Sequence, residues 1–331
     1  MPQLTRRAFL RSSATAAATV AISQSLQLSA FAAQPACRWG AFVEPADPLD
    51  PKDPLGSTRA FESEIGRRLG MTRHYLRWNY QPIPSLSMQQ SASGHRVPFM
   101  DWRPQKTPET GGAYIRWGDI ANGVHDSEID SVGTALASWG KTAYFTFNHE
   151  PENDAVNCGT AAEYKAAYAR IKQRFVAAGA TKIKYVCTLV QGTFKGLNGG
   201  PGAWFANGAQ YVGADGYNRG KCSGGWKSFE TLFGEAHDFA VSRSRSMVVE
   251  EWGCAPPNAC GGTAPQTKAD WFNDAAATIE SWPEIKAVIY TNISATYRSN
   301  VVDFTVDSSG TDPAAAAAYV AVGHDPYFNP T

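Results

Sequence analysis

The chain has 331 residues, of which 43% are apolar and 18% are charged. This composition is typical of a globular protein, because a disordered chain carries fewer apolar residues and more charge. Lys and Arg together number 30, as do Asp and Glu, and this zero net charge excludes a strongly basic nucleic-acid-binding protein. The length allows one large domain or two small ones.

The first 33 residues have the layout of an export signal. Residues 5–11 (TRRAFLR) resemble a twin-arginine motif, a weakly apolar Ala-rich stretch follows, and AFAA at 30–33 is typical of a cleavage site. The apolar stretch is shorter than the ~20 residues that a membrane-spanning helix needs. We therefore predict a twin-arginine signal peptide over residues 1–33, and a secreted mature chain over residues 34–331 that does not enter a membrane.

Beyond residue 33, short apolar runs alternate with longer helical stretches. The runs are rich in Val, Ile, Phe, Tyr and Trp and are bounded by Gly, Pro, Asn and Asp, which is typical of strands. The predicted strands are residues 38–43, 75–80, 97–102, 143–149, 183–190, 211–217, 247–252 and 287–293. Several are nearly continuous in apolar content, as in parallel strands that are buried on both faces.

Helices are predicted between most of these strands. Capping-box patterns at Thr160 and Thr267 open two of them, over residues 160–178 and 267–281. The others are predicted at 61–69, 128–139, 228–241 and 313–320, whereas residues 81–96 show no clear helix. Eight strands alternating with helices predict a single-domain α/β fold, the (β/α)8 or TIM barrel. No Gly-rich phosphate turn follows the first strand, which disfavours a doubly wound open sheet.

Six cysteines suit an exported protein, and their pairing cannot be read from the sequence alone. Cys254 and Cys260 flank a turn-rich stretch, so a local disulfide is plausible there. Cys158 and Cys222 both fall in predicted loops and are a second candidate pair. Cys187 lies inside an apolar strand and is predicted to be a small core residue. The cysteines form no C-x-x-C pattern and have no histidine at ligand spacing, so we predict no metal and no cofactor.

Acidic residues stand at the ends of three predicted strands. Glu150 follows the fourth strand, Asp215 lies near the end of the sixth, and Glu250 and Glu251 end the seventh. Burying a carboxylate without a partner is unfavourable, so such residues are usually paired, metal-bound or catalytic. The strands of a barrel end at one common mouth, where two carboxyls can face each other. Glycoside hydrolysis requires such a pair, one protonated and one ionised.

Three motifs resemble those of glycoside hydrolase family 26 and its exported actinobacterial relatives. They are residues 148–153 (NHEPEN), 213–218 (GADGYN) and 251–253 (EWG), and the resemblance spans residues 39 to 293 in motif order and spacing. It implies a retaining (β/α)8 hydrolase whose acid/base follows strand four and whose nucleophile follows strand seven. By this resemblance Glu150 is the acid/base, Glu251 is the nucleophile, His149 shapes a sugar subsite and Tyr217 hydrogen-bonds the nucleophile.

The acidic neighbours of these two residues need separate interpretations. Neighbouring strand residues point to opposite faces, so Glu250 is predicted to point toward the helices and to need a Lys, Arg or backbone partner. Glu250 is also the chief competitor for the role of Glu251. Glu152 is interpreted as a solvated loop charge, with a substrate contact as the alternative. Asp215 is either a structural turn residue or a hydrogen-bonding subsite residue.

Several tryptophans fall near predicted strand ends, where their rings can stack on sugars, although core packing is the alternative for each of them. Together with the motif residues, they complete the predicted set of substrate contacts: His149, Tyr217, Asn148, Trp78, Trp102, Asp215 and Trp252.

The sequence therefore predicts a secreted, monomeric, retaining glycoside hydrolase that degrades a β-linked polysaccharide, with a β-mannan-like polymer as the first candidate. It predicts no nucleic-acid partner. Two alternatives remain open. The same mechanism can act on another polymer, such as mixed-linkage β-glucan, β-1,3-xylan or an uncommon bacterial polysaccharide. Alternatively, the chain is a carbohydrate-binding barrel without activity.

Overall fold

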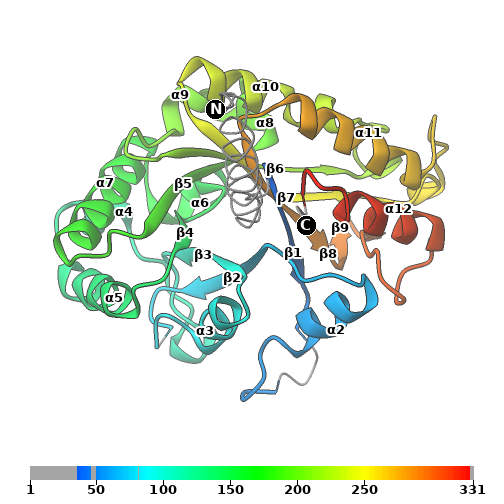
Figure 1. Cartoon of the computed structure of the whole chain (residues 1–331). Coiled ribbons are helices and arrows are strands. Elements are labelled where there is room, and N and C mark those ends of the chain that lie inside the picture. Colours follow the sequence, from blue (N-terminus) through cyan, green and yellow to red (C-terminus); the bar gives the residue numbers. More distant parts are fainter. Residues whose placement is uncertain (1–35, 46–49, 81, 329–331) are drawn as a thin grey trace, which may run out of the picture.

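The computed structural model describes residues 36–45, 50–80 and 82–328. Eight parallel strands close into a barrel in the order β1 to β8, and helices surround it (Figure 1). β8 pairs back to β1 from Arg38 opposite Ala287 to Val43 opposite Asn292, which closes the barrel. The predicted single-domain (β/α)8 fold is therefore confirmed. The predicted signal peptide lies outside the described residues.

The strands follow the predicted apolar runs closely, except at the second. They are β1 (Arg38–Val43), β2 (Met71–Arg77), β3 (Val97–Arg103), β4 (Ala143–Phe147), β5 (Ile183–Val190), β6 (Tyr211–Asn218), β7 (Ser246–Cys254) and β8 (Ile285–Asn292). A short antiparallel hairpin, β9 (Ser294–Tyr297) and β10 (Asn300–Asp303), follows the last barrel strand. β2 begins four residues earlier than predicted and ends three residues earlier, at Arg77.

The helices occupy the connections between strands. They are α2 (Gly56–Glu64), α3 (Leu86–Ser93), α4 (Trp117–Ala121), α5 (Asp126–Trp139), α6 (Pro151–Cys158), α7 (Ala161–Ala177), α8 (Gln191–Phe194), α9 (Pro201–Trp204), α10 (Phe229–Ser242), α11 (Lys268–Ser281) and α12 (Pro313–Gly323). Both predicted capping boxes are present, at Thr160 and at Thr267. Within the described ranges, no helix is both long and apolar enough to cross a bilayer.

The helix α3 lies within residues 81–96, which showed no clear helix in the sequence, and the short helices α4, α6, α8 and α9 were not predicted either. The Ser85 side chain caps α3 by accepting a hydrogen bond from the Met88 backbone N–H at 3.2 Å. Met88 and Ser91 are its only buried residues, so it presents a narrow apolar face. A short helix with so few buried positions gives a weak periodic signal.

The core has two apolar layers, and their arrangement leaves the barrel mouth for polar groups. Inside the barrel lies a small apolar cluster: Met71, Phe99, Tyr144, Val186, Val248, Ala287 and Ile289. A much larger cluster fills the space between the strands and the surrounding helices. Toward the carboxyl ends of the strands the buried residues include Arg73, Asp101, Asp215 and Glu250. Polar chemistry is therefore concentrated at that end of the barrel.

The disulfide differs from both predicted pairings. Cys222, after β6, is bonded to Cys260, after β7, and so joins the loops that follow two neighbouring strands. Cys254 and Cys158 are buried and unpaired, because one ends β7 and the other ends α6 against the core. Cys187 is buried in β5, as predicted.

Candidate active site

A β-bulge in β7 sets the geometry of the site. Ala214 of β6 pairs with Val249, but the next residue, Asp215, pairs with Glu251, so Glu250 is an extra residue in β7. A bulge of this kind breaks the alternation of side chains along a strand. Val248 belongs to the cluster inside the barrel, and Glu250, two residues later, also lies inside it. As a result both acidic residues face the barrel interior.

Glu251 is held by three donors. Its Oε1 accepts hydrogen bonds from Arg73 Nη1 at 2.5 Å and from the Tyr75 hydroxyl at 2.7 Å. Its Oε2 accepts a hydrogen bond from the Tyr217 hydroxyl at 2.5 Å. Burial by itself would raise the pKa of Glu251. The charges of Arg73 and His149 and the two tyrosine hydrogen bonds outweigh burial and lower this pKa to about 2. Glu251 is therefore ionised at neutral pH.

Glu150 lies at the end of the fourth strand in a strained conformation. Its φ of 49° is in the left-handed region, and the residue directly precedes α6. The backbone N–H of Glu150 donates to the Thr188 carbonyl of β5 at 3.1 Å, and its carboxyl accepts from Asn153 Nδ2 at 2.8 Å. Burial and the nearby Glu251 charge raise the pKa of Glu150, against the opposing effects of His149, Arg73 and Asn153. The two carboxyls thus have pKa values shifted in opposite directions.

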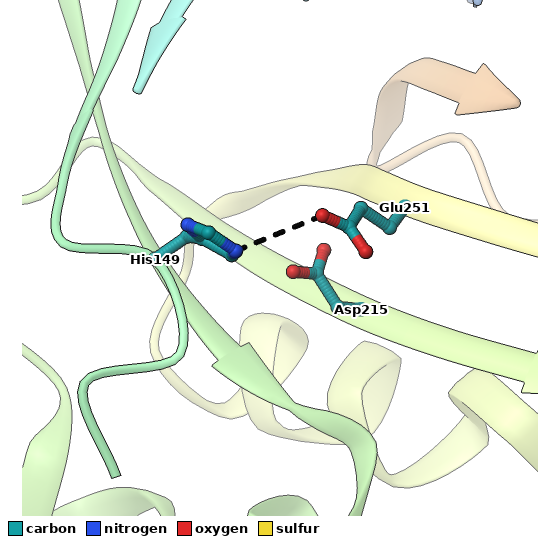
Figure 2. Close-up of side chains that lie close together, drawn as sticks. All are labelled: His149, Asp215 and Glu251. Carbon is teal, nitrogen blue, oxygen red and sulfur yellow. Dashed lines mark ion pairs between the residues drawn. The ribbon is translucent and has the colours of Figure 1, made fainter. Parts of the chain in front are cut away.

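His149 lies beside Glu251. Its Nε2 is 3.7 Å from Glu251 Oε1, and its Nδ1 forms an ion pair with the buried carboxylate of Asp101. Burial lowers the pKa of His149, but Asp101 and Glu251 outweigh burial and raise this pKa to about 9. Figure 2 shows the imidazole pointing toward Glu251. The ring therefore carries a positive charge at neutral pH.

Glu250 has a buried partner, although not on the side that the sequence predicted. Its carboxyl lies 2.7 Å from Arg73 Nη2 and also accepts a hydrogen bond from the Thr188 hydroxyl. Both contacts lie inside the barrel, so the prediction that Glu250 points toward the helices is wrong, and the bulge is the reason. The predicted need for an Arg, Lys or backbone partner is met by Arg73. Burial and the Asp101 charge raise the pKa of Glu250 to about 7, despite Arg73.

Asp215 lies in β6 beside Glu251, and only 3% of it is exposed. Neither carboxyl oxygen has a hydrogen-bond partner among the described residues. Burial, Glu251 and Glu250 raise the pKa of Asp215 well above its ordinary value. Ligand-type atoms of His149, Asp215 and Glu251 all lie within 4.8 Å of one another (Figure 2). A metal ligand must be deprotonated, and the raised pKa of His149 keeps its ring protonated at neutral pH, so this set does not favour a cation.

The remaining predicted substrate contacts are buried in the structure. Trp78 is 3% exposed, and Trp102 and Trp252 have no exposed surface. Their rings pack on other core aromatics, such as Trp78 on Trp102 at 4.3 Å between ring centroids. Asn148 is fully buried as well, accepting from Trp117 Nε1 at 3.1 Å and donating to Asp154 at 2.9 Å. These four residues are therefore part of the packed structure around the site. The prediction that the three tryptophans offer open faces to sugars is wrong.

Sequence reasoning missed two residues that contact Glu251 and misjudged a third near Glu150. Met71, Arg73 and Tyr75 occupy every second position of β2 and so share one face of the strand. This period of two was the signal that could have placed Arg73 and Tyr75 in the site. Glu152 is not a solvated loop charge. It is half-buried in the first turn of α6, accepts a hydrogen bond from the Val190 backbone N–H at 3.0 Å, and burial raises its pKa to about 7.

The fold is similar to those of several glycoside hydrolases. The catalytic domain of a GH26 endo-β-1,4-mannanase from Bacillus sp. JAMB-750 matches with a TM-score of 0.57 and 15% identity, covering 88% of this chain and 86% of that one. A GH26 β-mannanase from Bacteroides ovatus matches with a TM-score of 0.54 and 12% identity, covering 93% of each chain. A fungal β-1,4-galactanase matches with a TM-score of 0.56 and 13% identity, covering 91% of this chain and 96% of that one.

No protein-family model and no curated protein matches the sequence. At identities of 15% and below, the structural similarity establishes a shared fold with these enzymes.

Proposed function

We propose that the chain is a retaining glycoside hydrolase that cleaves a β-linked polysaccharide. The observation that carries this proposal is that two carboxyls at one barrel mouth have pKa values shifted in opposite directions. Glu251 is ionised, with its pKa lowered to about 2, whereas burial and the charge of Glu251 raise the pKa of Glu150. A pair of carboxyls whose environments separate their pKa values is what acid/base and nucleophile roles require.

The proposed reaction uses the two carboxyls in different roles. Glu150 donates its proton to the oxygen of the leaving sugar while Glu251 attacks the anomeric carbon and forms a glycosyl-enzyme. Glu150, now ionised, takes a proton from a water molecule, which attacks the anomeric carbon and releases Glu251. Arg73, Tyr75 and Tyr217 hydrogen-bond to both oxygens of Glu251, so the carboxylate is oriented before substrate arrives.

The polymer is proposed from the structural neighbours. One of them is an endo-β-1,4-mannanase, and another is a β-1,4-galactanase. We therefore propose a β-1,4-linked backbone as the first candidate. Mixed-linkage β-glucan, β-1,3-xylan and an uncommon bacterial polysaccharide remain as alternatives. We further propose that the enzyme is exported by its first 33 residues and acts as a monomer outside the cell.

The test is reducing-end release from a panel of β-mannan, β-1,4-galactan, mixed-linkage β-glucan and β-1,3-xylan. Glu251→Gln should remove nearly all turnover, and Glu150→Gln should lower it by roughly 10²–10⁴-fold. Glu128→Gln is the matched control, because Glu128 is on α5 and its side chain is 52% exposed. The anomer of the first product, followed by NMR, should retain its configuration.

Full turnover in Glu251→Gln would contradict the assignment of the nucleophile. An inverted product would contradict the retaining mechanism. Binding without cleavage on every polymer would favour the carbohydrate-binding barrel instead.

A further inference from the structure

A guanidinium at the barrel mouth lies between two tyrosine rings. Arg219 follows β6, and its Cζ is 4.5 Å from the ring centroid of Tyr217 and 4.5 Å from that of Tyr297 in β9. The hydroxyl of the same Tyr217 donates to Glu251 at 2.5 Å. Stacking on aromatic faces orients a guanidinium while leaving its N–H donors free. Arg219 is thus separated from the proposed nucleophile by a single side chain.

Two further cations lie around Tyr297. Arg298 is at the turn between β9 and β10, with its Cζ 5.2 Å from the Tyr297 ring. A hydrogen bond with Ser223 and the charges of Arg298, Arg219 and Lys227 lower the pKa of Tyr297. Lys227 comes from the loop between β6 and α10, so segments about 70 residues apart in sequence supply the cluster. We call Arg219, Lys227 and Arg298 the cationic cluster.

The cationic cluster has no anionic partner in the described part of the chain. None of its three side chains forms an ion pair there, and none donates a hydrogen bond. Partial burial and repulsion from Lys195 and Arg219 lower the pKa of Lys227. Like charges that are held together without a counter-charge raise the free energy of the unliganded protein. A bound anion would relieve this repulsion.

We propose that the cationic cluster is a subsite for an anionic group on the polysaccharide, either a uronic acid carboxylate or a sulfate ester. This inference rests on the proposed function, since it identifies the substrate class of the same site. Arg is suited to such groups because its planar donors match two oxygens at once. The zero net charge of the chain argues against a broad surface for nucleic acid. The place of Arg219 beside Tyr217 puts the anion on a sugar close to the scissile bond.

The test measures binding with the nucleophile removed, so that the ligand stays intact. Glu251→Gln protein is titrated calorimetrically with three oligosaccharides of one β-linked backbone: unsubstituted, glucuronic acid-substituted and sulfated. One or both anionic ligands should bind at least about tenfold more tightly than the neutral one at low salt, and added NaCl should reduce this ratio. Adding Arg219→Gln should lower the ratio by roughly tenfold, as expected for a lost charge-assisted hydrogen bond.

Arg245→Gln is the matched control, because Arg245 is an exposed arginine directly before β7, at the opposite end of the barrel. It should leave the ratio unchanged. Equal affinity for neutral and anionic ligands would overturn the subsite. An equal effect of Arg219→Gln and Arg245→Gln, or equally tight binding of polyaspartate, would overturn it too, since general charge attraction would then be the cause.

The proposed function has its own readout in this design. Cleavage of the neutral polymer by the wild type, without any preference for anionic ligands in binding, would support the proposed hydrolase function and overturn the proposed subsite. Suppose instead that an anionic ligand binds preferentially through Arg219 and that the wild type cleaves no ligand. This result would support the subsite and overturn the hydrolase function. A preference between the glucuronic acid and sulfate ligands identifies the anion, and either preference supports the proposal.

Discussion

Replacing Glu250 by Gln tests the electrostatics of the barrel interior. Glu250 is fully buried between Arg73 and Thr188, and its pKa is raised from 4.5 to about 7. In the unfolded chain this carboxyl ionises near pH 4.5, whereas in the folded protein it stays protonated until near pH 7. The folded state therefore binds more protons between these values, and stability falls as pH rises. A shift of this size corresponds to about 3 kcal/mol.

Gln has nearly the same shape as a protonated Glu and cannot ionise. It can accept a hydrogen bond from Arg73 and donate one to Thr188. Below pH 4.5 the variant should therefore be about as stable as the wild type, and above pH 7 it should be more stable by up to about 3 kcal/mol. Urea unfolding at pH 4.5 and pH 8 measures this difference, and Glu128→Gln should show no comparable change. Parallel pH dependence in the wild type and Glu250→Gln would refute this reasoning.

Measurements of kcat distinguish the role of Glu250 from that of Glu251. Because the contact between Arg73 and Glu251 does not involve the Glu250 carboxyl, Glu250→Gln should retain most of its kcat, whereas Glu251→Gln should not.

Three further results are expected. The imidazole of His149 should titrate near pH 9 by NMR, so its stabilising charge is complete below about pH 6.5 and is lost as pH rises through 9; a midpoint near 6.5 would contradict its pairing with Asp101. Cys222→Ser should lower the free energy of unfolding by about 4 kcal/mol, from the loop of 38 residues that the disulfide closes; equal unfolding with and without reductant in the wild type would contradict this. Replacing Arg6 and Arg7 together by Lys should keep the protein inside cells, measured by immunoblot of medium and cells, whereas unchanged secretion would contradict the export prediction.

The second strand shows why part of the site escaped the sequence analysis. Strands were recognised as apolar runs, and this works where both faces of a strand are buried in apolar surroundings. In β2 the residues that face the interior are Met71, Arg73 and Tyr75, two of which serve the site. The polar residues interrupt the apolar run, so the predicted strand began at Tyr75. The polar residues that serve the site thus hid the first half of β2 from a search for apolar runs.

The tryptophans were misplaced although the alternation of strand residues was available. Asp101 contacts Arg73 and His149 in the interior, so its neighbour Trp102 must face the helices. In a barrel the outward face of a strand is covered by helices and is part of the core. A strand-end tryptophan next to an inward acid is therefore a core residue rather than a sugar platform.

The bulge in β7 could not be predicted in the same way. Perfect alternation allows only one of Glu250 and Glu251 to face the interior, and neither residue that flanks this pair is a glycine or a proline that would indicate an irregularity. The extra residue is visible only in the register between β6 and β7, which depends on contacts across the barrel. The disulfide between Cys222 and Cys260 is a similar case, because it depends on where two loops meet.

The pKa values of the carboxyls at the barrel mouth differ because three of them contact the single guanidinium of Arg73. Arg73 reaches Glu251 at 2.5 Å, Glu250 at 2.7 Å and Asp101 at 3.4 Å, and one positive charge cannot compensate three buried carboxylates. Glu251 also has two tyrosine donors and Asp101 has His149, so the pKa values of both are lowered. Glu250 has only the Thr188 hydroxyl besides Arg73, and its pKa is raised. The ionised state of Glu251 thus depends on the number of donors that reach it, and the bulge lets it reach them while Glu250 occupies the space below.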